Sequence, residues 1–161
     1  MKIASPIARL FAALLLIGAC GSALGQTPYG LPITLDQAKK AMAAAESEAK
    51  KNSWPVAIVI VDSGGNMVMM QKLDNTQHAS VDIARGKATT AVNLRRPTKA
   101  LEDAIAAGGA NLRLLAVNGV YPLEGGIPIV VEGKIIGGIG VSGVLSGQDA
   151  QCAAAGQNAL K

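Results

Sequence analysis

The sequence predicts a single α+β domain in which helices flank an antiparallel sheet. Two pairs of apolar, β-branched runs are each joined by a short turn segment, as in β-hairpins. Segments with a helical spacing of apolar residues precede, separate and follow these pairs. Hairpins joined by helices imply an antiparallel sheet with helices packed on it. The chain has 161 residues, of which 50% are hydrophobic and 16% charged, which suffices for one domain with a buried core.

The N-terminal residues 1–25 have the composition of an export signal. Lys2 and Arg9 precede an uninterrupted apolar run over residues 10–19. This run is too short to cross a bilayer, because a spanning helix needs about 20 apolar residues. We therefore expect a protein that leaves the cytoplasm for a periplasmic or secreted location.

Two processing sites for this signal compete. Small residues at Ala23 and Gly25 favour cleavage before Gln26, which would release a soluble exported protein. Residues 17–20 instead resemble a bacterial lipobox, which would make Cys20 a lipidated N-terminus and anchor the protein to a membrane. The sequence leaves both sites open.

Removal of the signal also removes part of the basic charge. The full chain carries a net charge of +4, and the loss of Lys2 and Arg9 lowers it to +2. A charge this small gives no argument for binding to nucleic acid, so no nucleic-acid partner is expected. Cys152 is then left without a partner in the chain, and its small neighbours predict a packing residue.

The domain is expected over residues 34–161, after a linker at residues 26–33 that contains two prolines and a glycine. Thr34 and Gln37 have the spacing of a capping box, so they predict the start of the first helix, which ends at residues 52–53. The apolar face of that helix carries Leu35, Ala38, Met42, Ala45 and Ala49.

Two hairpins are expected to form the sheet. The run over residues 56–61 is apolar throughout, so it should be a central strand buried on both faces. A turn rich in Gly and Asn connects it to a second strand over residues 67–73. The second hairpin has strands over residues 127–132 and 135–142 around a turn at Gly133.

Methionines and glycines on these strands are interpreted as structural. Met67 and Met69 are expected to share one face of their strand; thioethers can ligate copper or haem iron, but strand methionines more commonly fill the core. The glycine-rich residues 137–140 match neither a P-loop nor a dinucleotide-binding motif. We interpret them as points where another part of the backbone comes close.

Three further helices follow from the spacing of apolar residues. A helix over residues 80–94 is stopped by Pro97, and a short helix over residues 101–107 is closed by two glycines. The last helix is expected to start at Ala150, behind a cap formed by residues 146–149.

Five cations without an acid among them mark the helix over residues 80–94 and the segment after it: Arg85, Lys87, Arg95, Arg96 and Lys99. On a continuous helix Arg85 and Arg96 would share one face, and two guanidinium groups there would suit a carboxylate or another anion. The alternative is a solvated basic face near a helix end, where cations complement the helix dipole.

No metal centre is predicted, because His78 is the sole histidine and no cysteine cluster accompanies it. His78 is either a surface or capping residue at a helix start, or an axial haem ligand, since haem iron needs only one protein ligand. Glu124, beside Gly125 and Gly126, is the carboxylate expected at a pocket mouth, with Tyr121 shortly before it.

Four stretches resemble the GlcG/HbpS-like family, which also includes the C-terminal domain of PduO-type proteins: residues 85–91, 123–129, 132–143 and 148–150. The resemblance implies a profilin- or PAS-like domain with a five-stranded antiparallel sheet flanked by helices, and a homo-oligomer. In this family HbpS is an exported haem-binding protein that works with a sensor kinase. Some relatives degrade haem, and GlcG accompanies glycolate-oxidation genes.

The leading hypothesis is therefore an exported, homo-oligomeric protein that binds a small molecule, with haem as the leading ligand and a membrane sensor or an uptake system as a partner. The candidate ligand-binding residues are His78, Arg85, Lys87, Arg96, Tyr121, Glu124, Gly125 and Gly126. The alternative is an enzyme or binding protein for a small organic acid. In that case a cation of the helix would hold the carboxylate, and Glu124 or Tyr121 would move a proton.

Overall fold

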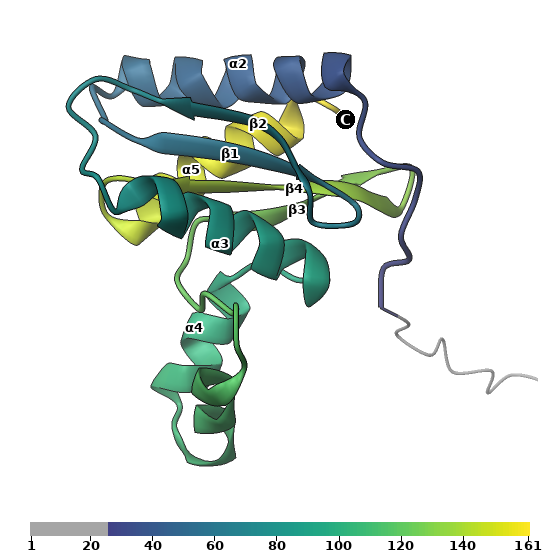
Figure 1. Cartoon of the computed structure of the whole chain (residues 1–161), viewed down its shortest axis with the longest axis vertical. Helices are drawn as coiled ribbons and strands as arrows, with labels where there is room; N and C mark the ends of the chain where they lie inside the picture. The colour runs from purple at the N-terminus through teal and green to yellow at the C-terminus, as the bar shows by residue number, and fades with distance from the viewer. Residues whose placement is uncertain (1–25) are drawn as a thin grey trace, which may run out of the picture.

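The computed structural model describes residues 26–161. The predicted signal and Cys20 lie outside this range. The elements follow in the order α2 (Leu35–Lys51), β1 (Ala57–Asp62), β2 (Met67–Lys72), α3 (Ser80–Asn93), α4 (Lys99–Ala106), η1 (Gly109–Ala116), β3 (Gly126–Val131), β4 (Lys134–Ser142) and α5 (Ser146–Asn158) (Figure 1). Among the helices in this range, none combines the length and the apolar character that a membrane span needs.

The strands form one antiparallel sheet in the order β2-β1-β4-β3. The α+β class is confirmed, but the sheet of residues 26–161 has four strands, whereas the family resemblance implied five. The N-terminal segment comes nearest to a fifth strand: Gly30 N–H donates to the Ile135 carbonyl at 2.8 Å, and Ile33 N–H to the Ile136 carbonyl at 2.7 Å. It forms only an isolated bridge, because its two prolines lack the N–H groups that a ladder needs.

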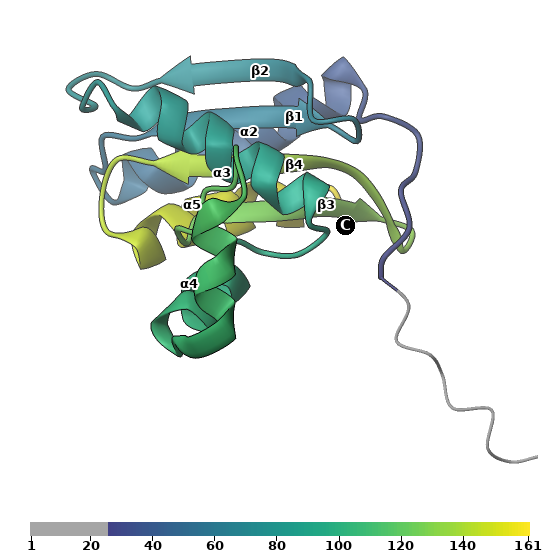
Figure 2. The ribbon, with the colours of Figure 1, turned by 60° about the horizontal axis from the view of Figure 1, so that its bottom comes forward.

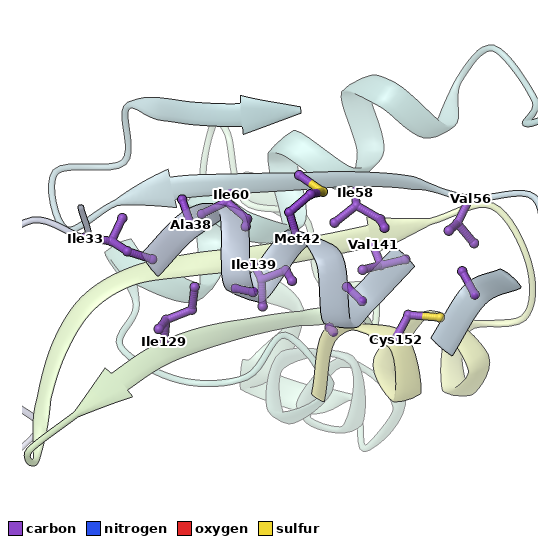
Figure 3. Close-up of a cluster of buried hydrophobic side chains, with 14 of the residues drawn as sticks. Ile33, Ala38, Met42, Val56, Ile58, Ile60, Ile129, Ile139, Val141 and Cys152 are labelled. Carbon is purple, nitrogen blue, oxygen red and sulfur yellow. The ribbon is translucent and has the colours of Figure 1, made fainter. Parts of the chain in front are cut away.

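Helices cover the two faces of the sheet unequally. α2 and α5 pack side by side on one face, and α3 packs alone on β4, β1 and β3 of the other (Figures 1 and 2). Ile58 and Ile60 of β1 belong to the core under α2 and α5, which Figure 3 shows. Val59 and Val61 belong to the core under α3. β1 is thus buried on both faces, as its continuous apolar run predicted.

α3 lies so close to β4 that their backbones touch. A Cβ atom added at Gly140 would lie 2.0 Å from the Ala84 carbonyl oxygen, and one added at Gly138 would lie 2.8 Å from the Ala88 carbonyl oxygen. No side chain could fit between helix and strand at these positions. The interpretation of these glycines as points of close backbone approach is confirmed.

The boundaries of α2 and α3 agree with the sequence to within two residues, α4 begins two residues earlier than predicted, η1 was not predicted, and α5 begins four residues early. The capping box of α2 is present, with Thr34 Oγ1 accepting from Gln37 N–H at 3.2 Å. α5 begins at Ser146, so residues 146–149 form its first turn rather than a preceding cap. The side chain of Gln148 explains the difference, because its Oε1 accepts from Leu145 N–H at 3.2 Å and thereby caps the helix from within.

Cys152 is fully buried in the core beneath α2 and α5, as its small neighbours predicted (Figure 3). Burial raises the pKa of its thiol to about 12. The thiol therefore stays protonated and unreactive at neutral pH, because the thiolate is the nucleophilic form.

We expect Gly140→Ala to lower the free energy of unfolding by about 2 kcal/mol or more, because the added methyl would push α3 off the sheet. Urea denaturation of the purified protein measures the change. Gly147→Ala in the first turn of α5 is the control, since its Cβ would have no atom within 4 Å. Equal stability of the two variants would contradict the close contact between α3 and β4.

Candidate functional site

The outer surface of α3 forms the floor of a cavity of about 340 Å³. The β1–β2 turn borders the cavity on one side, and the chain that returns from η1 borders it on the other. Its lining residues are Gly65, Asp82, Arg85, Gly86, Thr89, Gly119 and Tyr121. The structure thus brings together two of the predicted site residues, Arg85 and Tyr121.

Tyr121 is held directly on the backbone of α3. Its N–H donates to Thr90 Oγ1 at 2.9 Å, which fixes the returning chain against the helix. A Cβ atom added at Gly86 would lie 2.3 Å from Cδ2 of the Tyr121 ring, so the ring occupies the space that a side chain at Gly86 would need. Glycine inside a helix lowers stability by about 1 kcal/mol relative to alanine. A glycine is needed at position 86 because the Tyr121 ring occupies the space of a side chain there.

Sequence reasoning missed Gly86 and Thr90 as parts of this site. The available signal was the glycine itself, since a glycine in the middle of a helical pattern has a packing or functional reason in many proteins. Thr90 gave no such signal, because a threonine inside a helix does not by itself indicate a contact with another segment.

Arg85 is the exposed cation of the cavity. Within residues 26–161, none of the ion pairs uses it. Its guanidinium group is therefore free to bind an anion from solution, and a carboxylate can take both of its parallel N–H groups.

The other four cations of the cluster lie outside the cavity, and Arg96 is exposed with its Nε donating to the Leu94 carbonyl at 3.1 Å. Arg95 stacks on the Tyr29 ring at 4.2 Å from its centroid, and Lys99 pairs with Asp103. The prediction that Arg85 and Arg96 share a helical face is wrong. α3 ends at Asn93, and Arg95 takes a left-handed conformation with φ of 51°, so the helical register does not reach Arg96.

Lys87 lies inside the protein rather than in the cavity. Its Nζ donates to Asp149 Oδ2 and to the Val141 carbonyl, each at 2.9 Å, and the two side chains of the ion pair are only 2% and 3% exposed. Burial raises the pKa of the Asp149 carboxyl, while the hydrogen bond from Lys87 acts in the opposite direction. The pair ties α3 to β4 and to α5.

Gly125 and Gly126 allow the start of β3 to lie close to Lys87. A Cβ atom at Gly126 would lie 2.4 Å from the Lys87 carbonyl oxygen, and one at Gly125 would lie 2.9 Å from Lys87 Nζ. Gly126 N–H also donates to Thr98 Oγ1 at 2.9 Å. Glu124 is half-buried, and its N–H donates to the carboxylate of Glu102. None of these three predicted residues lines the cavity at Arg85.

His78 is exposed in the turn just before α3 and does not line the cavity. It lies two residues before the first residue of α3, Ser80, so the helical register does not fix its position relative to Arg85. In the part of the chain that the structure describes, no group of three or more His, Cys, Asp and Glu side chains could hold a metal ion.

A larger hollow of about 550 Å³ lies at the other end of the sheet and contains none of the predicted site residues. It is lined by Glu46, Lys50, Ser53, Trp54, Pro55, Gln71, Lys72, Leu73, Asp74 and Asn75. Its two acids and two lysines balance in charge, as Asp82 and Arg85 do in the smaller cavity, so the two sites differ in the predicted residues that they contain rather than in net charge.

Comparison with known proteins supplies the family. Residues 33–158 match the family model described as haem degrading protein HbpS-like. This chain belongs to the HbpS-like family. Protein GlcG of Escherichia coli K12 is 37% identical over 110 residues, which cover 68% of this chain and 81% of GlcG.

Two solved structures extend the likeness to three dimensions. A double mutant of HbpS from Streptomyces reticuli has a TM-score of 0.75 at 33% identity and covers 99% of both chains. A PduOC–haem complex has a TM-score of 0.75 at 27% identity and covers 81% of this chain and 96% of that one. These comparisons confirm the predicted resemblance to the GlcG/HbpS-like family.

We expect removal of either partner of the Lys87–Asp149 pair to cost about 3–5 kcal/mol, because the remaining charge would be buried without a partner. The variants are Lys87→Met and Asp149→Leu, and the free energy of unfolding from urea titrations measures the loss. The double variant should be far more stable than the sum of the two losses predicts, since it leaves no buried charge. Strictly additive losses would contradict this account.

Proposed function

We propose that this HbpS-like chain binds haem on the outer surface of α3. The support is the position of Arg85 beside Tyr121 in a cavity on that surface, in a family whose description names haem. The structural similarity to a PduOC–haem complex points in the same direction. Haem carries two carboxylates on a flat apolar ring, and its iron takes one protein ligand in many haem proteins.

The residues of the α3 surface fit such a ligand in three respects. Arg85 offers an unpaired guanidinium group for a propionate. Tyr121 offers an aromatic ring that is held by Gly86 and Thr90. His78 is exposed in the turn before α3 and offers an imidazole for the iron, without an ion-pair partner among the described residues.

A small organic acid is the second candidate ligand. The cavity of about 340 Å³ lies at the lower end of the sizes that ligand pockets have, and Arg85 would bind a carboxylate there. Similarity to GlcG supports this candidate weakly. In this alternative Tyr121 is the proton-moving group of the cavity, because Glu124 lies outside it.

We further propose that the protein is exported and self-associates, and that a membrane sensor is its partner. The projecting segment of α4 and η1 extends away from the sheet (Figure 1). It also exposes apolar side chains, which supports self-association. No residue of η1 is buried. The exposed apolar side chains of the segment and the chain after it are Leu112, Leu115, Val117 and Leu123.

Titration with hemin should give a saturable Soret band, and Arg85→Ala should weaken hemin binding about ten-fold through the loss of a charge-assisted hydrogen bond. Arg113→Ala, an exposed arginine of η1, is the matched control and should bind as the wild type does. His78→Ala should shift the Soret band. Absorbance that rises linearly without saturation would contradict haem binding.

A small hydroxy acid tests the alternative ligand. Protection of the wild type against thermal unfolding by this acid, lost in Arg85→Ala, would favour the organic-acid alternative.

The mass of the protein isolated from membranes and from the periplasm or medium tests the export proposal. Cleavage before Gln26 predicts a soluble species that starts at that residue, and lipobox processing predicts an acylated species that starts at Cys20. A full-length cytoplasmic protein that starts at Met1 would contradict export.

A further inference from the structure

The edge strand β2 has one face that no helix covers. α3 packs on β4, β1 and β3 but not appreciably on β2, which lies at the edge of the sheet (Figure 2). On the opposite face, α2 does pack against β2. The uncovered face is therefore the one beside α3 and its cavity.

Two methionines occupy this uncovered face. Met70 pairs with Val59 and Met67 with Val61, and both valines point towards α3. Cross-strand partners in an antiparallel pair point to the same side of the sheet, so both methionines face the α3 side. Met67 is 55% exposed and Met70 is 45% exposed.

A β-bulge produces this pairing. The register shifts between Ile60 and Val61, so Val68 has no partner in the ladder. Met69 pairs with Ile60 and packs against the core under α2 and α5. The expectation that Met67 and Met69 share a face is therefore wrong, because the extra residue puts Met67 and Met70 on one face instead.

The methionine face and the cavity at Arg85 lie at the same level of the molecule, although neither methionine lines the cavity. A Cβ atom at Gly65 of the β1–β2 turn would lie 3.5 Å from Thr89 Cγ2, so the turn touches α3 at that level. β2 and α3 are antiparallel, so moving forward along β2 and backward along α3 from this contact leads in the same direction (Figure 1). Met67 is two residues along the chain from Gly65, so the two lie at most about 7 Å apart. Arg85 is four helical residues, about 6 Å, from Thr89, so Met67 and Arg85 come to the same level.

An exposed apolar edge is costly for a protein, because edge strands invite pairing with other chains and are usually protected by charges or prolines. On the uncovered face of β2, Lys72 is the one charged residue that could protect the edge, and it follows Met70 along the strand. Long, polarisable methionine side chains adapt to flat surfaces and make favourable contacts between sulfur and aromatic rings. These properties suit a flat aromatic ligand that is larger than the cavity itself.

We propose that Met67 and Met70 form the apolar wall against which the ring of the ligand lies while Arg85 binds its carboxylate. This inference rests on the proposed function and extends the site from α3 onto the sheet edge. It requires a ring-sized ligand, because a small organic acid bound at Arg85 would not reach both methionines.

The test compares Met67→Glu and Met70→Glu with Met67→Leu and Met70→Leu in titrations with hemin and with metal-free protoporphyrin. We expect the glutamate variants to weaken the binding of both ligands at least ten-fold, because a charge would meet the apolar ring. The leucine variants should bind within about three-fold of the wild type, since leucine preserves apolar volume. Leu35→Glu is the control, because it introduces the same charge at a residue of α2 that is 51% exposed, on the other side of the sheet.

The outcomes separate the wall from the proposed function. Saturable hemin binding by the wild type, with equal affinity in the glutamate variants, overturns the wall and leaves haem binding intact. Equal weakening by Leu35→Glu also overturns it, because the effect would then be one of net charge. Failure of the wild type to bind hemin overturns both proposals. Melting temperatures within a few degrees of the wild type would show that the exposed substitutions leave the fold intact.

Discussion

The direct contact between the backbones of α3 and β4 determines where a ligand can bind. Gly138 and Gly140 let the helix lie on the strand with no side chain between them. A helix with its side chains is about 10–12 Å wide, whereas the four strands span about 14 Å between their outer axes. Two helices therefore cover the face under α2 and α5, but the single helix α3 leaves β2 uncovered on the other face. The unequal cover leaves the methionines of β2 exposed, and the cavity lies beside them between the β1–β2 turn and the chain after η1.

The buried Lys87–Asp149 pair holds this arrangement at the other flank of α3. Its two charges are almost completely removed from water, and their hydrogen bonds reach the Val141 carbonyl and Val144 N–H. A buried pair of this kind is weak evidence for net stability, because desolvation offsets the attraction. Its effect is on specificity of packing: a shift of α3 along β4 would separate the charges and leave both without partners in the interior.

The spacing of apolar residues in the sequence predicted most of the helices and strands, but it predicted only part of the candidate site. The continuous apolar run of β1 and the capping box at Thr34 gave a central strand and a helix start that the structure confirms. The predicted helix over residues 80–94 ends close to where α3 ends, but local pattern could not show the left-handed conformation of Arg95 or the bulge beside Val68, because both depend on tertiary contacts and on single backbone angles. The role of Lys87 was equally hidden, since its partner Asp149 is 62 residues away in the sequence.

Three consecutive residues of α3 explain how one short stretch serves both packing and binding. Successive helical residues are about 100° apart, so Arg85 and Lys87 point in nearly opposite directions. Lys87 is therefore buried against Asp149, Arg85 remains exposed in the cavity, and Gly86 between them accepts the ring of Tyr121. The cation cluster seen in the sequence is thus no uniform basic face. Of these three residues, Arg85 on the solvent side keeps its charge available for an anion, and the glycine beside it lets the ring of Tyr121 line the same cavity.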